Sequence, residues 1–109
     1  MPQVKERLYF EAIRSRDSAS FTGSYQTLGS VLANPSRFLM IVNNSGVLVT
    51  ISLDGTNDHL VLQAGGALTF DEVANAVPYA QFCIAAGTQF YVKGSASTGL
   101  VYLSTAYAG

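Results

Sequence analysis

The sequence predicts an all-β fold, an antiparallel β-sandwich or jelly roll of about eight or nine short strands. Two observations support this prediction. Apolar residues recur at every second position over short stretches, which is the period of a strand with one buried face. Turn sequences rich in Gly, Asn, Asp, Ser and Pro separate these stretches at intervals of about ten residues, as in sandwiches. With 109 residues, of which 49% are hydrophobic, the chain can bury one modest core.

The expected strands follow one another along the chain, and the breaks between them have the composition of turns. The strands are expected at residues 8–13, 25–32, 37–43, 47–53, 59–63, 67–70, 81–85, 89–93 and 100–107. The turns between them are expected at 34–36, 43–46, 54–55, 65–66, 86–88 and 94–99. Residues 71–76 are the one helical candidate, and because Pro78 follows so closely we interpret them as a loop or a single turn.

Two strands indicate which side chains are inside. The core face of strand 47–53 is expected to hold Val47, Val49, Ile51 and Leu53, and its outer face Leu48, Thr50 and Ser52. Strand 37–43 is apolar on both faces, since Phe38, Met40 and Val42 alternate with Leu39 and Ile41. We therefore expect it to be central, with the face of Leu39 and Ile41 covered by a partner subunit. The alternative is that both faces are internal.

Charge is concentrated at the N-terminus. The chain has six Lys and Arg and seven Asp and Glu, and seven of these charges lie within residues 5–17. Charged residues make up 12% of the chain, against about 25% in ordinary domains. Hydroxyl and amide groups are easier to desolvate than charges, so this composition favours a surface that packs against other protein.

Residues 1–17 have two interpretations, and residues 18–109 would form the sandwich domain. The first is an arm on a neighbouring subunit, with its basic residues paired at the rim of the contact. The second is an edge strand whose charges prevent unwanted pairing. The basic residues of the expected contact are Lys5, Arg7, Arg14 and Arg16.

Several partner classes are disfavoured. A net charge of -1 leaves no electrostatic footprint for nucleic acid or an anionic membrane. No apolar run approaches the roughly 18 to 20 residues of a membrane span, and the N-terminus is charged where a signal peptide would be apolar. We expect neither a nucleic-acid nor a membrane partner.

Residues 52–59 are the most chemically suggestive stretch. Asp54, Asn57 and Asp58 could bind calcium, but their order does not follow the EF-hand pattern. The favoured interpretation is a β-turn at Asp54 and Gly55 with side-chain turns to the backbone. A metal site and a partner contact stay as alternatives. His59 has no second His to complete a zinc site, so no cofactor is expected.

Catalysis has little support in the sequence. Cys83 could pair with His59 as nucleophile and base, but its neighbours Phe82 and Ile84 are those of a buried hydrophobe. We expect a protein that is not an enzyme. Six Tyr and six Phe without any Trp are expected mostly in the core or an interface, and a glycan-binding platform is the alternative.

A resemblance gives these expectations a context. The runs that carry it are Phe38 to Gly55 followed by Thr56 to His59, Gly87 to Gly94, and Gly99 to Ser104. Over roughly residues 25–108 the chain resembles small β-sandwich proteins of tailed bacteriophage virions. The resemblance implies a non-enzymatic structural subunit, either a head decoration or cementing protein or a component of the neck or tail. It also implies other virion proteins as partners, a homo-oligomer, and a location in the virion after synthesis in the host cytoplasm. The competing function is a receptor- or glycan-binding module of a tail or fibre.

Overall fold

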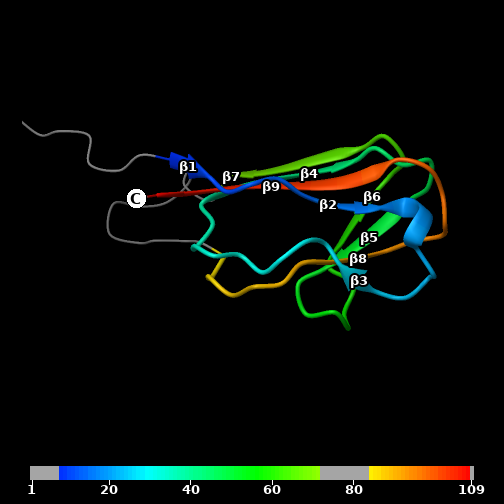
Figure 1. Ribbon diagram of the computed structural model, residues 1–109, viewed down its shortest axis with the longest axis horizontal. Coiled ribbons are helices and arrows are strands. Elements are labelled where there is room, and N and C mark those ends of the chain that lie inside the picture. The colour runs from blue at the N-terminus through cyan, green and yellow to red at the C-terminus, as the bar shows by residue number, and fades with distance from the viewer. Residues whose placement is uncertain (1–7, 72–83, 109) are drawn as a thin grey trace, which may run out of the picture.

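The fold consists of two antiparallel β-sheets packed face to face (Figure 1). It is seen in a computed structural model that describes residues 8–71 and 84–108. The strands are β1 (Leu8–Phe10), β2 (Arg14–Asp17), β3 (Gln26–Thr27), β4 (Phe38–Asn43), β5 (Val49–Ser52), β6 (Leu60–Leu62), β7 (Ala67–Asp71), β8 (Tyr91–Lys93) and β9 (Leu100–Ala108). Sheet A has the order β1-β9-β4-β7, with β2 also paired to β9, and sheet B has the order β3-β8-β5-β6. The predicted all-β sandwich is confirmed.

Most predicted strands are present, and two differ. Strand 25–32 is reduced to β3, because Gly29 has a φ of 74° that interrupts the pleat. The chain beyond Gly29 still runs beside residues 84–90, with Leu32 N donating to Thr88 O (2.9 Å). The predicted strand 8–13 ends at Phe10, and β2 follows it.

Two further predictions lie partly outside the described residues. Of the predicted strand 81–85, Ile84 forms an isolated bridge with Ser36, and residues 81–83 are not described. Of the helical candidate 71–76, Asp71 is the last residue of β7, and the rest is not described. The single helix in the described ranges is the short 3-10 turn Ser18–Ser20.

The core fills the space between the sheets. Val49 and Ile51 of β5 are fully buried, as predicted, and Leu48 is exposed. Ser52, predicted to face outward, is also fully buried, and its hydroxyl accepts hydrogen bonds from the amides of Asp54 (3.2 Å) and Gly55 (2.9 Å) that offset the cost of burial. The buried cluster consists of Phe21, Leu28, Leu32, Leu39, Ile41, Val49, Ile51, Leu62, Phe90, Val92, Val101 and Leu103.

Asn43 connects the two sheets at the end of β4. Its side chain is completely buried. Its amide nitrogen donates to the carbonyls of Val47 (2.9 Å), Leu62 (3.2 Å) and Gln63 (3.0 Å). Its amide oxygen accepts from the Ser45 hydroxyl (2.6 Å). Because each of these groups has a partner, burial of this polar side chain is compatible with a stable core.

Candidate interaction surface

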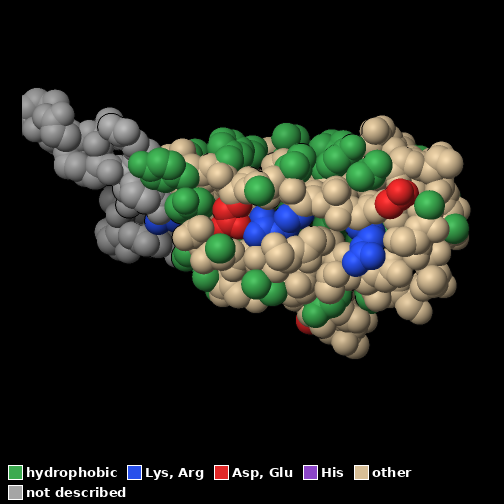
Figure 2. Space-filling view, in the orientation of Figure 1, with side chains coloured by type: hydrophobic (Ala, Val, Ile, Leu, Met, Phe, Trp, Pro, Cys, Tyr) green, Lys and Arg blue, Asp and Glu red, His purple; other side chains and the backbone are tan. Residues whose placement is uncertain are grey.

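The outward side of sheet A, which we call the outer face, is mostly apolar. The register places Phe38, Met40 and Val42 of β4 opposite Ala106, Ser104 and Tyr102 of β9, and opposite residues share a face of the sheet. Figure 2 shows hydrophobic side chains along this upper edge of the molecule, over the strands that Figure 1 labels β7, β4 and β9. The outer face includes Leu8, Phe10, Ser15, Asp17, Phe38, Met40, Val42, Ala67, Thr69, Tyr102, Ser104 and Ala106.

Two phenylalanines form the most prominent part of the outer face. Phe10 of β1 and Phe38 of β4 both pair with Ala106, which lies between them. Because Ala106 is small, the two rings meet edge to face over it, with centroids 6.3 Å apart, and Ala106 is fully buried. Phe10 itself remains 65% exposed. A large apolar side chain thus packs on its neighbours and is still exposed on the surface.

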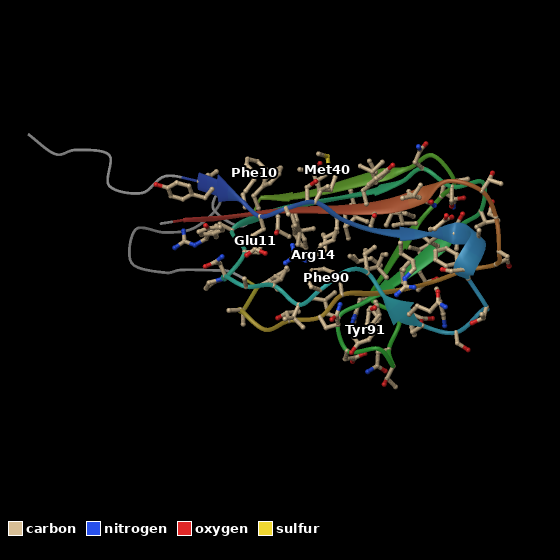
Figure 3. All side chains as sticks on the ribbon, in the orientation of Figure 1. Phe10, Glu11, Arg14, Met40, Phe90 and Tyr91 are labelled. Atoms are coloured by element: carbon tan, nitrogen blue, oxygen red, sulfur yellow. The ribbon has the colours of Figure 1, made fainter. Side chains whose placement is uncertain are left out.

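The structure places Leu39 and Ile41, the residues predicted for a partner contact, inside the sandwich. Both side chains point toward sheet B and are buried in the core of this chain, with exposures of 1% and 0%. Their register partners on β9, Thr105 and Leu103, are equally buried. The surface that a partner can reach is the opposite side of β4, where Figure 3 shows Met40 pointing away from the second sheet.

A one-residue insertion decides where the charged residues of β2 point. Phe10 pairs with Ala106 and Arg14 with Leu103, so four steps along the N-terminal chain match three steps along β9. Such a bulge exchanges the two faces for every residue after it. Even-numbered side chains face outward in β1, whereas Arg14 and Arg16 in β2 face sheet B.

Arg14 is therefore a structural residue, with a side chain only 8% exposed. Its guanidinium donates to the carbonyls of Ser30 (2.8 Å) and Val31 (2.9 Å) and to Glu11 Oε1 (2.6 Å). In Figure 3, Glu11 and Arg14 lie between the two layers. Burial raises the pKa of Glu11, but hydrogen bonds from Arg14 and Asn34 outweigh it, so the pKa lies below its ordinary value.

The other charges of this segment are also engaged within the chain. Arg16 Nε donates to Thr27 O on β3 (2.8 Å), and Asp17 accepts from the Ala19 amide (2.9 Å). Residues 8–10 and 14–17 are edge strands of sheet A, which is the second interpretation of the N-terminal segment. Lys5 and Arg7 lie outside the described residues. Contacts of Arg14 or Arg16 with a partner find no support in this arrangement.

Residues 52–59 form the predicted turn. Asp54 Oδ1 accepts from the amides of Thr56 and Asn57, both at 2.8 Å, and these bonds hold the pKa of Asp54 well below its usual range. Gly55 has a φ of 80° and lies on the ring of Tyr91. His59 Nδ1 accepts from the Leu53 amide (3.0 Å) and closes the loop.

A polar cluster lies beside this turn on the outward side of sheet B. The Tyr25 hydroxyl donates to Asp58, and Lys93 contacts the same carboxylate (3.2 Å) while its ammonium lies 4.6 Å from the Tyr25 ring centroid. Burial and the Asp58 hydrogen bond raise the pKa of Tyr25 to about 12. The same hydrogen bond and Lys93 lower the pKa of Asp58. The sequence gives no signal for this cluster, because Tyr25 and Asp58 meet only through folding.

The remaining candidate chemistry is limited. Cys83 is not among the described residues, so its pairing with His59 stays a prediction. Residues 8–71 and 84–108 contain no group of three or more His, Cys, Asp or Glu side chains that could hold a metal ion. Across the same ranges, no helix has the length and apolar character of a membrane span. The outer face of sheet A is thus the best candidate for a functional surface.

Comparison with family models, with curated proteins and with solved structures finds no significant match to the chain.

Proposed function

We propose that this protein is a non-enzymatic structural subunit of a tailed-phage virion that packs against other virion proteins through the outer face of sheet A. The observation that carries the proposal is that the part of this face formed by β1, β4 and β9 has no charged residue. Glu11, Arg14 and Arg16 are engaged inside or along the sandwich, whereas Phe10 is 65% exposed on the outer face. The sequence resemblance alone supports the assignment to a phage particle.

The size of the outer face favours attachment in many copies. Four strands about 4.8 Å apart and about 20 Å long cover on the order of 400 Å². A standard interface buries about 800 Å² per partner, so one such contact would be weak. Repetition around a particle multiplies weak contacts, as a head decoration or cementing protein or a ring in the neck or tail requires. Synthesis in the host cytoplasm and incorporation into the virion complete the proposal.

Neighbouring residues on β4 provide the test. Met40→Asp places a charge on the outer face and should leave a folded protein whose incorporation into purified particles falls at least tenfold. Ile41→Asp places the charge in the core, where it has no partner, and should unfold the chain. Thr50→Asp, on the outward side of sheet B, is the matched control and should fold and be incorporated.

The result should be read from circular dichroism together with quantitative mass spectrometry of the particles. Normal incorporation of folded Met40→Asp would show that the outer face is not the contact. Absence of the wild-type chain from particles would remove the virion proposal itself. If the wild-type chain is present in particles, electron microscopy of the intact particle would locate it in the head, neck or tail.

One observation favours the competing function, a receptor- or glycan-binding module. Tyr25, Asp58 and Lys93 place an aromatic ring, a carboxylate and an ammonium side by side, and sugars are bound by such combinations of ring and polar groups. Binding of a glycan in an array, lost in Tyr25→Ala and retained in Met40→Asp, would favour this function over packing.

A further inference from the structure

The two flanks of the sandwich differ in how they are closed. On one flank, Arg14 and Arg16 of β2 donate to carbonyls of residues 27–31 and join sheet A to the edge of sheet B. On the other flank lie β7, an edge of sheet A, and β6, an edge of sheet B. Among the described strands, β7 pairs with β4 alone.

The edge at β7 lacks the features that usually prevent strand pairing. Natural edge strands carry charges, prolines or bulges that block a further strand. The first four residues of β7 are Ala67, Leu68, Thr69 and Phe70, which are uncharged. The opposite edge of the sheet has Arg14, Arg16 and Asp17 in β2. Among the described residues, sheet A thus has three charges on the β2 edge, whereas the β7 edge has one, Asp71 at its end.

Phe70 shows that this edge is also incompletely covered. It is the register partner of Leu39, so its side chain lies on the inward face of sheet A. Leu39 is 1% exposed, whereas Phe70 is 49% exposed. An inward-facing aromatic side chain at the rim would gain burial from an additional strand beside β7.

The backbone of β7 has hydrogen-bond donors and acceptors on the side away from β4, in the plane of the sheet. Asn43 N donates to Gly66 O (2.8 Å), which sets the phase of the ladder between β4 and β7. In an antiparallel ladder, alternate residues bond to the same neighbour. Leu68 and Phe70 therefore bond to β4, and the amide and carbonyl groups of Ala67 and Thr69 point away from it.

We infer that β7 pairs antiparallel with β7 of a second copy of this chain, about a two-fold axis at Thr69, so that sheet A continues from one copy into the next. This register overlaps all five residues of the strand. It places Phe70 beside Leu68 of the second copy, an apolar pair on the inward face. It also places Asp71 beside Ala67 and keeps the two Asp71 residues apart.

A second copy is the occupant that fits this edge best. Two-fold symmetry brings a strand against itself in the antiparallel direction that β7 needs. The first four residues of β7 are uncharged, and the register keeps the two Asp71 residues at opposite ends, so the strand can pair with itself without like-charge repulsion. Pairing would also join two outer faces into one wider apolar surface.

The inference goes beyond the proposed function, and dimerisation does not require that the protein belongs to a phage particle.

The test is the mass of the full chain in solution, measured by sedimentation velocity over a concentration series. The wild type should reach twice the chain mass of 11.6 kDa. Thr69→Pro removes the outward amide without removing a bond to β4, and it should remain monomeric with an unchanged circular dichroism spectrum. Val61→Lys changes an exposed apolar residue on the edge of sheet B, and as the control it should still dimerise.

If Thr69→Pro does not fold, hydrogen exchange of the wild type still tests the pairing of β7. The Thr69 amide should be protected in the dimer and exchange at least tenfold faster on dilution, while the Phe70 amide stays protected at both concentrations. A wild type that is monomeric at every concentration overturns the inference. So does a dimer that survives Thr69→Pro. Neither result bears on incorporation into particles.

Discussion

Arg14→Ala should be among the most destabilising single substitutions in the chain. It removes the guanidinium bonds to Ser30 O, Val31 O and Glu11, and leaves the Glu11 carboxylate, with a side chain 9% exposed, without its cation. Breaking one partner of a buried ion pair typically costs about 3 to 5 kcal/mol. The whole stability of a domain is about 5 to 15 kcal/mol, so this loss is a large fraction of it.

Urea unfolding followed by circular dichroism measures the effect. With a slope of about 2 kcal/mol/M, the midpoint should fall by about 1.5 to 2.5 M. Arg16→Ala is the matched control, because Arg16 contacts Thr27 at the surface and its loss should cost at most about 1 kcal/mol. Equal, small shifts for both variants would refute a structural role for the buried arginine.

The same contact predicts a pH dependence. Because the pKa of Glu11 is lowered in the folded chain, its contribution to stability is present above the unfolded value of about 4.3 and is lost as pH falls through the folded value. Glu11→Gln removes this titration, so the stability gap between wild type and variant should shrink with falling pH in urea melts. A gap that stays constant between pH 6 and pH 3 would contradict the assignment.

Three further predictions test other parts of the structure. Asn43→Asp removes the amide donors of a fully buried side chain to three carbonyls and should destabilise by about 3 kcal/mol or more in urea melts, whereas Asn44→Asp, at an exposed neighbour, should change little. Gly55→Val should destabilise the fold by about 1 to 3 kcal/mol, because Gly55 has a left-handed backbone conformation. A chelator should leave the melting temperature of the wild type unchanged. A drop in the melting temperature would support a metal in this turn. Incorporation through an apolar face should persist in 1 M NaCl, where the Debye length is about 3 Å, and loss of incorporation there would indicate an electrostatic contact.

An earlier expectation about the N-terminus changes with the structure. An arm across a neighbour could be deleted without harm to the fold. Residues 8–17 instead supply two edge strands and the buried Arg14, so deletion of residues 1–17 should destabilise the sandwich. Impaired incorporation of such a truncated protein would therefore say nothing about partner contacts.

The fold class was accessible from local sequence alone. Strand periodicity and turn residues are local properties, and they predicted β4, β5 and β9 close to their observed bounds. The turn at Asp54 and Gly55 was equally accessible, because its hydrogen bonds join residues within three positions of one another. A low content of charge also predicted a surface that packs against other protein, without locating it.

Tertiary structure decided which side of β4 is the surface. Both faces of this strand are apolar, so periodicity cannot tell Leu39 and Ile41 from Phe38 and Met40. The choice depends on where sheet B packs. Asn43 lies on the same face of β4 as Leu39 and Ile41. A polar residue in a strand usually indicates the solvent-exposed face, so Asn43 suggests the opposite of what is observed. It is buried because carbonyls of residues 47, 62 and 63 accept its hydrogen bonds.

Tertiary structure also decided the role of the N-terminal charges. The one-residue bulge between β1 and β2 is visible only in their register with β9, some ninety residues away in the sequence. That bulge turns Arg14 into the sandwich, where carbonyls of residues 30 and 31 and the Glu11 carboxylate compensate its charge. Composition determined that this protein has few charges, and long-range strand pairing determined that Arg14 and Arg16 of β2 point into the sandwich and serve the fold.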